Sequence, residues 1–264
     1  MTTTLITGAN KGLGYETARR LVAAGHTVYV GSRDAERGRR AAEQLGARHV
    51  LIDVTDDASV AAAAAAVEAD GGLDVLVNNA GIEERRPDGT VYTPAEVTAE
   101  QMRTTFETNV FGVVRVLHAF LPLLRRSAAP VVVNVSSGLG SLAIGTTEGT
   151  PVYAYPGVAY PASKAAVNRL TVQYAKAFPE MRINAVEPGY TRTDLNFNTG
   201  TQTVEEGAEI IVRMAQVAPR RSHRGLLHRA GPAALVSQQQ PPLPQQDSPA
   251  MGSSSTGAAA PTSS

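Results

Sequence analysis

A tyrosine and a lysine stand four residues apart in the second half of the chain, at Tyr160 and Lys164. On a helix this spacing places both side chains on one face. An ammonium favours the charged form of a neighbouring phenol, so we expect the pKa of Tyr160 to fall below its usual value of about 10. Of the tyrosines nearby, Tyr160 alone has this lysine partner, and the whole chain has only three lysines. The pair therefore predicts a group that gives or takes a proton.

Three glycines follow the first apolar segment, within Thr7-Gly8-Ala9-Asn10-Lys11-Gly12-Leu13-Gly14. Gly8 allows a tight turn, Gly12 lets backbone N–H groups approach a pyrophosphate, and Gly14 permits close contact between helix and strand. A helix that begins here would direct the positive end of its dipole at the phosphates. The pattern predicts a dinucleotide site, with an ordinary glycine-rich turn as the alternative.

Apolar segments alternate with helical patterns along most of the chain. Strands are predicted over 3–7, 27–30, 49–52, 73–77, 130–135 and 182–186, and helices over 37–45, 59–68, 106–124 and 162–178. Several strands are continuous apolar runs, which is typical of parallel strands buried on both faces. We therefore expect an α/β fold, a doubly wound parallel sheet of the Rossmann type in a single domain. Ligands of such folds bind outside the carboxyl ends of the strands.

The composition excludes several classes of function. The 264 residues carry 24 basic and 24 acidic side chains, so no net charge indicates nucleic acid or an anionic membrane as a partner. The chain has no cysteine, which excludes disulfides, thiolate metal sites and cysteine nucleophiles, and we expect no metal. The sequence shows neither a signal peptide nor a run of 18 apolar residues, so we expect a cytoplasmic protein without a membrane span.

Five further motifs follow the glycine loop in chain order. They are Asn78-Asn79-Ala80-Gly81, Asn109-Val110-Phe111-Gly112, Asn134-Val135-Ser136-Ser137, Tyr160-Pro161-Ala162-Ser163-Lys164 and Pro188-Gly189-Tyr190-Thr191-Arg192-Thr193. With these motifs the chain resembles the short-chain dehydrogenase/reductase family over roughly residues 1–215. The segments Asn10-Lys11-Gly12 and Val186-Glu187-Pro188-Gly189 are similar to its carbonyl-reductase branch.

The resemblance implies NADPH-dependent reduction of a ketone or aldehyde to an alcohol. Tyr160 would act as general acid, Ser137 would hydrogen-bond the substrate oxygen, and Lys164 would bind the nicotinamide ribose and tune Tyr160. Asn109 would hold a water in the proton relay. A serine hydrolase is excluded because neither Ser136 nor Ser137 has a glycine two residues before it. A regulator that senses the dinucleotide without turnover is the alternative function.

Two residues after the second strand bear on the choice of cofactor. Enzymes that use NAD usually carry an acid at this strand end, bonded to the ribose. Here Ser32 takes that position and Arg33 follows it, while Asp34 is the rival ribose ligand. Lys11 could also reach a 2′-phosphate. Together Ser32, Arg33 and Lys11 favour NADPH/NADP over NAD.

The family pattern assigns cofactor contacts to a larger set of residues. These are Gly8, Asn10, Lys11, Gly12, Leu13, Gly14, Ser32, Arg33, Asp53, Val54, Asn79, Ala80, Gly81, Tyr160, Lys164, Pro188, Gly189 and Thr191. Asp53 would contact the adenine, or it could instead cap a helix from Thr55.

The chain departs from the family pattern in two places. Residues 138–159 separate the serine from the tyrosine by more than is usual, and an insert there would cover the face through which oligomers of the family pair. We therefore favour a monomer, with a homo-oligomer as the alternative. After Val217 only Gly225-Leu226-Leu227 could form the expected seventh strand. We expect a catalytic domain over 1–230, a disordered low-complexity tail over 237–264, and a substrate pocket lined by 139–159 and 190–203.

Overall fold

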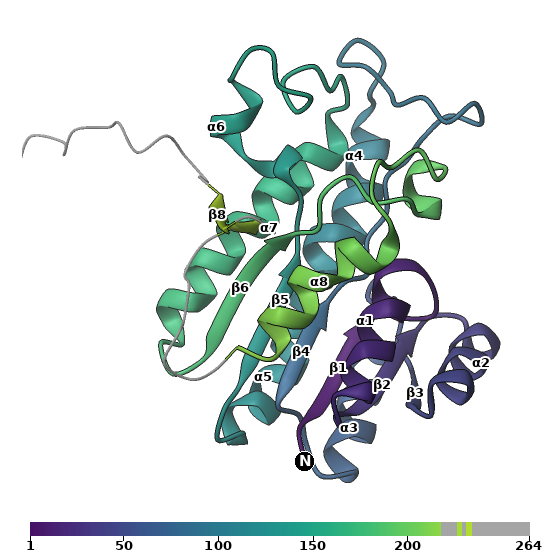
Figure 1. Cartoon of the computed structure of the whole chain (residues 1–264), viewed down its shortest axis with the longest axis vertical. Coiled ribbons are helices and arrows are strands. Elements are labelled where there is room, and N and C mark those ends of the chain that lie inside the picture. Colours follow the sequence, from purple (N-terminus) through teal and green to yellow (C-terminus); the bar gives the residue numbers. More distant parts are fainter. Residues whose placement is uncertain (218–225, 229–230, 234–264) are drawn as a thin grey trace, which may run out of the picture.

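The computed structural model describes residues 1–217, 226–228 and 231–233. Its strands form one sheet in the order β3-β2-β1-β4-β5-β6-β7-β8, parallel throughout except for the antiparallel pair β7 and β8 (Figure 1). The strands are β1 (Thr3–Thr7), β2 (Thr27–Ser32), β3 (Arg48–Leu51), β4 (Val75–Asn78), β5 (Val131–Val135), β6 (Arg182–Glu187), β7 (Leu226–His228) and β8 (Gly231–Ala233). The predicted doubly wound α/β sheet is confirmed.

Helices cover both faces of the sheet. On one face lie α1 (Gly12–Ala23), α2 (Ala35–Leu45) and α8 (Val204–Ala215), and on the other lie α3 (Asp57–Ala69), α5 (Gly112–Arg126) and α7 (Ala159–Ala177). Alternate strand residues enter the two cores, so that Leu5 packs with Phe120 on one side while Ile6 packs with Ile211 on the other. This double burial accounts for the unbroken apolar runs in the sequence.

The helix predicted over 106–124 is interrupted near its start, and it is preceded by a helix that was not predicted. An α-helix, α4 (Ala99–Phe106), leads into a π-helical turn (Glu107–Phe111) and then into α5. Such π turns inside α-helices are frequent at functional sites, and this one carries Asn109. The combined stretch Ala99–Arg126 is long and apolar enough to cross a membrane, but half of its most apolar window is buried inside the fold. Its apolarity is that of a core helix.

Three short elements lie near the carboxyl edge of the sheet. A 3₁₀ turn (Gly138–Gly140) and α6 (Leu142–Gly145) begin the inserted segment between β5 and α7, and Figure 1 shows α6 above the sheet. A second 3₁₀ turn (Asp194–Asn196) lies in the loop after β6. Next to the edge strand β8, β7 pairs with β6 at the position predicted for the seventh strand. The predicted tail over 237–264 lies outside the described residues.

Candidate active site

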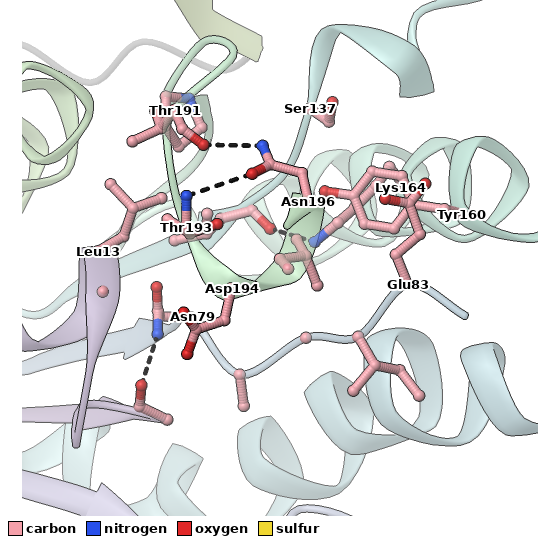
Figure 2. A pocket seen from close by; sticks show the side chains of 18 of the residues that line it. Leu13, Asn79, Glu83, Ser137, Tyr160, Lys164, Thr191, Thr193, Asp194 and Asn196 are labelled. Atoms are coloured by element: carbon pink, nitrogen blue, oxygen red, sulfur yellow. Dashed lines mark hydrogen bonds between the residues drawn. The ribbon is translucent and has the colours of Figure 1, made fainter. Parts of the chain in front are cut away.

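A cavity of about 1150 Å³ opens at the carboxyl edge of the sheet. It is bordered by the glycine loop, by the segments that follow β3, β4, β5 and β6, and by the N-terminal turn of α7 (Figure 2). The residues with predicted roles that line it are Gly8, Asn10, Lys11, Gly12, Leu13, Gly14, Arg33, Asp53, Val54, Asn79, Ala80, Gly81, Ser137, Tyr160, Lys164, Pro188, Gly189 and Thr191. Within the described part of the chain, only Ser32 and Asn109 of the predicted set lie outside this lining.

Three side chains with proton and hydrogen-bonding chemistry meet at one end of the cavity. Ser137 follows β5, and a hydrogen bond joins its side chain to Tyr160 in the first turn of α7. Lys164 lies one helical turn further on, with its Nζ atom 5.4 Å from the centre of the Tyr160 ring. Its ammonium donates to the Val135 carbonyl oxygen at 2.8 Å. The predicted i, i+4 helical pair is thus present and is anchored to the end of β5.

The two serines after β5 have different environments. Ser136 is buried, and its hydroxyl donates to the Asn168 side-chain oxygen at 2.6 Å. Ser137 instead reaches Tyr160 and accepts from the backbone N–H of Leu139 at 3.2 Å. Ser137 is therefore the serine whose hydroxyl shares a site with the phenol.

The electrostatics of Tyr160 differ from the expectation drawn from the sequence. Burial raises the pKa of Tyr160, and the Glu83 carboxylate raises it further, while the hydrogen bond to Ser137 acts in the opposite direction. Burial also lowers the pKa of Lys164, to about 8, so that its ammonium is present at neutral pH but is lost above pH 8. The expected lowering is wrong for the ligand-free protein, and Tyr160 holds its proton at neutral pH.

Asn109 is buried beside the site, and its side chain bonds to the segments around it. Its side-chain oxygen accepts from the backbone N–H of Ile82 at 2.8 Å, and its side-chain nitrogen donates to the Ile82 carbonyl oxygen at 2.9 Å and to the Ser163 hydroxyl at 3.0 Å. These bonds tie the loop after β4 to α7. Asn109 is a positioning residue in this structure, and its role in holding a water stays a prediction.

The glycine loop packs closely against the loop after β4. Gly8 has a φ of +65°, in the left-handed region that favours glycine. A Cβ atom on Gly14 would come within 2.6 Å of the Asn79 side-chain nitrogen and 2.7 Å of the Gly8 carbonyl oxygen. Asn79 in turn donates to the Thr7 and Gly8 carbonyl oxygens, which fixes the loop after β4 against the loop after β1 (Figure 2).

Gly14→Ala is expected to lower the melting temperature of the protein. The added methyl group meets backbone and a fixed amide, and such overpacking costs about 1–3 kcal/mol. In a protein of this size the melting temperature would fall by about 2–4 °C for each kcal/mol. Gly145→Ala is the control, because its Cβ meets no atom within 4 Å in the described structure. Equal melting temperatures for both variants would contradict the close packing at Gly14.

The N-terminus of α1 is suited to an anion. The helices α2, α3, α4 and α8 are each capped by a side chain, from Asp34, Asp56, Thr98 and Thr203. Among the described residues no side chain caps α1, whose first residues Gly12, Leu13 and Gly14 line the cavity. Uncapped N–H groups and the helix dipole favour a phosphate here. The glycine loop on the cavity wall and the uncapped helix end together fit a dinucleotide.

Ser32 at the end of β2 and the two residues that follow it differ in their positions relative to the cavity. Arg33 is exposed and lines the cavity. Ser32 is buried, and its hydroxyl donates to the Asp34 carbonyl oxygen at 2.9 Å, so the structure does not bring it to the cavity. Asp34 caps α2 and forms an ion pair with Arg37 at 2.7 Å. The rival ribose ligand is thus engaged in its own helix.

Two further residues of the predicted cofactor set have protein partners of their own. Lys11 pairs with Asp194 at 2.8 Å across the mouth of the cavity, and both side chains are more than half exposed. Asp53 accepts from the backbone N–H and the hydroxyl of Thr55, which closes a turn. The alternative that Asp53 caps the next helix is wrong, because Asp56 is the N-cap of α3.

The sequence indicated no individual role for several side chains at the substrate end of the cavity. Glu83, Arg85 and Tyr155 all line it, next to Tyr160. A signal for the first two exists in the run of four charges Glu83-Glu84-Arg85-Arg86, which begins two residues after the Asn-Asn-Ala-Gly motif. Nothing in the sequence connected Tyr155 with them. Among the described residues, no three His, Asp or Glu side chains form a group that could hold a metal ion.

Comparisons with known proteins agree with this geometry. Residues 2–204 match the family model described as short chain dehydrogenase. The chain is 35% identical to a (+)-neomenthol dehydrogenase from Arabidopsis thaliana, over 80% of this chain and 90% of that protein. It is 39% identical to the short-chain dehydrogenase anuI from Penicillium roqueforti, over 80% of this chain and 87% of that protein.

A solved structure has the same architecture. The carbonyl reductase from chicken fatty liver, with NADPH bound, superimposes with a TM-score of 0.75 at 26% identity, covering 89% of this chain and 98% of that one. The family match extends over most of the chain and includes every motif at the cavity. The chain therefore belongs to the short-chain dehydrogenase family and is an oxidoreductase of the carbonyl-reductase type.

Proposed function

We propose that the protein reduces a ketone or aldehyde to an alcohol with NADPH as the hydride donor. The observation that carries this proposal is the meeting of Ser137, Tyr160 and Lys164 in the same cavity as the uncapped N-terminus of α1. A dinucleotide bound there supplies the hydride that is added to the carbonyl carbon. A regulator that only senses the dinucleotide would have no need of the three reactive side chains.

The residues have distinct tasks in this reaction. Ser137 donates a hydrogen bond to the carbonyl oxygen and polarises the C=O bond. Tyr160 gives its hydroxyl proton to the same oxygen as the negative charge develops there. The raised pKa of Tyr160 keeps that proton available at neutral pH, which favours the reductive direction. Lys164, with its charge close to the phenol, stabilises the tyrosinate that remains.

The preference for NADPH rests on Arg33. Its guanidinium is on the cavity wall at the end of β2, where the carboxylate of Asp34 is already bonded to α2 and Arg37. A guanidinium binds a phosphate dianion in a bidentate way and has no such partner in NADH. The chicken carbonyl reductase that superimposes on this chain holds NADPH, which supports the same preference.

The substrate is a small, uncharged and largely apolar carbonyl compound. The substrate end of the cavity includes Ile82, Leu139, Val152, Pro156 and Leu195. These come in part from the two segments predicted to line it, 139–159 and 190–203. Relatives are named neomenthol dehydrogenase and (-)-isopiperitenone reductase, which supports a small-molecule carbonyl substrate. We further propose that the protein acts as a monomer in the cytoplasm, with the insert over the face that family oligomers use.

A panel of cyclic ketones and aromatic aldehydes, followed by the loss of NADPH absorbance, tests the proposed function. We expect turnover of several members and one alcohol formed per NADPH oxidised. Tight NADPH binding without turnover of any member would favour the sensing regulator instead.

The pH dependence of the reaction should report Lys164. Because burial lowers its pKa to about 8, the ammonium is present below pH 8 and is lost above it. The value of kcat/KM should therefore be level near neutral pH and fall about tenfold per pH unit above 8. Tyr160 cannot cause this fall, because its pKa is raised. The exposed-face variant Lys176→Arg is the control and should have the same profile as the wild type, and a level profile up to pH 10 would contradict the assignment.

A further inference from the structure

Three side chains outside the reacting set form a hydrogen-bonded group beside Tyr160. Glu83 accepts from the Tyr155 hydroxyl through Oε1, and from the Arg85 guanidinium through Oε2 at 2.6 and 2.9 Å. The Glu83 side chain is 6% exposed and that of Arg85 is 13% exposed. We call Glu83, Arg85 and Tyr155 the clamp. Figure 2 shows Glu83 directed from the loop after β4 towards Tyr160.

The clamp joins segments that lie far apart in the sequence. Glu83 follows Ile82, whose backbone Asn109 holds on both sides. Arg85 also donates to the Gly89 carbonyl oxygen at 2.9 Å, which closes the turn over residues 83–91. Tyr155 belongs to the inserted segment before α7, 72 positions away from Glu83. The charge of the carboxylate and that of the guanidinium cancel each other, so the wall that they form is neutral.

The local sequence around Tyr155 is adapted to this contact. Its ring packs over Gly157, where a Cβ atom would come within 2.6 Å of the ring carbon Cε1. Glycine at this position therefore lets the ring turn back towards Glu83. On either side of Tyr155 the residues Pro151, Val152 and Pro156 line the cavity. Fixing Tyr155 thus fixes the apolar wall that faces the substrate.

We propose that the Glu83–Tyr155 hydrogen bond determines substrate specificity by holding the insert of residues 141–158 against the loop after β4, which sets the width of the substrate end of the cavity. This inference rests on the proposed function, since it describes the substrate half of the same site. A compact carbonyl compound needs the wall held in place before it binds. A larger carbonyl compound contacts the wall over more area, so its own binding energy can hold the wall in place.

Kinetics with a compact and a larger ketone test the proposal. Tyr155→Phe removes the hydroxyl and keeps the ring, and a hydrogen bond to a charged group is worth roughly tenfold or more in an equilibrium. With NADPH saturating, we expect KM for cyclohexanone to rise about tenfold at nearly constant kcat, and KM for 2-decalone to change less than about twofold. Glu83→Gln, which removes the carboxylate charge, should shift the ratio of the two KM values in the same direction.

The matched control is Tyr153→Phe, in the same segment but half exposed and absent from the cavity lining of the described structure. It should leave both KM values unchanged. Equal rises for the two ketones, or a fall in kcat at constant KM, would overturn the proposal, because the clamp would then act on folding or on the chemistry at Tyr160.

Hydrogen–deuterium exchange tests the clamp without any turnover. Amides of residues 141–158 should exchange about tenfold faster in Tyr155→Phe than in the wild type or in Tyr153→Phe. Unchanged exchange would overturn the clamp whatever the kinetics show. If the wild type reduced no carbonyl compound, the proposed function would fail, and the exchange rates would still decide whether Glu83 and Tyr155 hold the insert.

Discussion

Tyr160→Phe is expected to lower kcat for carbonyl reduction by about 10²–10⁴-fold, the usual contribution of a positioned general acid. The ring remains, so the packing of α7 is kept, and only the hydroxyl bonded to Ser137 is lost. The affinity for NADPH should change little, because the phosphates and the adenosine half are bound elsewhere in the cavity. Steady-state rates and NADPH fluorescence titration measure the two quantities separately.

Tyr174→Phe is the control for this variant. Tyr174 lies on the same helix and packs against Phe178, with 6.2 Å between ring centres, away from the cavity. Its loss of a hydroxyl should leave kcat unchanged. If Tyr160→Phe retained the wild-type rate on every reducible substrate, Tyr160 would not be the proton donor.

Arg33→Ala is expected to weaken the binding of NADPH by about 10- to 100-fold and to leave NADH almost unchanged. The reason is the loss of a charge-assisted contact with the 2′-phosphate, a group that NADH lacks. Ser32→Asp should act in the same direction by repulsion, although its side chain is buried and has to turn towards the cavity. Titration of each variant with both cofactors gives the ratio of the NADH and NADPH dissociation constants directly.

Arg40→Ala provides the comparison for Arg33. Arg40 is an exposed arginine on α2 that pairs with Glu36, and it is absent from the cavity lining among the described residues. Arg40→Ala changes the net charge by the same amount as Arg33→Ala, and it should alter the affinity for neither NADPH nor NADH. If Arg33→Ala lost affinity for NADH and for NADPH equally, Arg33 would be a surface residue without a role in the choice of cofactor.

Much of the fold could be predicted because its signals are local. The short segments at 3–7 and 130–135 were predicted as strands from their central apolar residues, and the structure has strands there, at Thr3–Thr7 and Val131–Val135. The glycine loop and Tyr160 with Lys164 are likewise short-range patterns. The π turn at Glu107–Phe111 was missed, because its residues continue the apolar periodicity of the helices on either side.

Contacts between distant segments could not be predicted from the sequence. The bond between Glu83 and Tyr155 depends on the fold of an insert that has no regular periodicity. The pKa of Tyr160 was expected to fall because Lys164 is near, but burial of both groups outweighs that proximity. Burial is a property of the assembled structure, and spacing along a helix does not report it.

Transfer of deuterium from the cofactor is the most direct test of the central claim. The wild-type protein is incubated with NADPH deuterated at the transferable position of the nicotinamide and with a ketone from the panel, and the product is examined by mass spectrometry and NMR. We predict one deuterium on the carbinol carbon for each cofactor oxidised, with Tyr160→Phe giving this product at a rate lower by at least about a hundredfold. Cofactor bound at this cavity with no deuterated alcohol formed from any ketone or aldehyde would contradict the account.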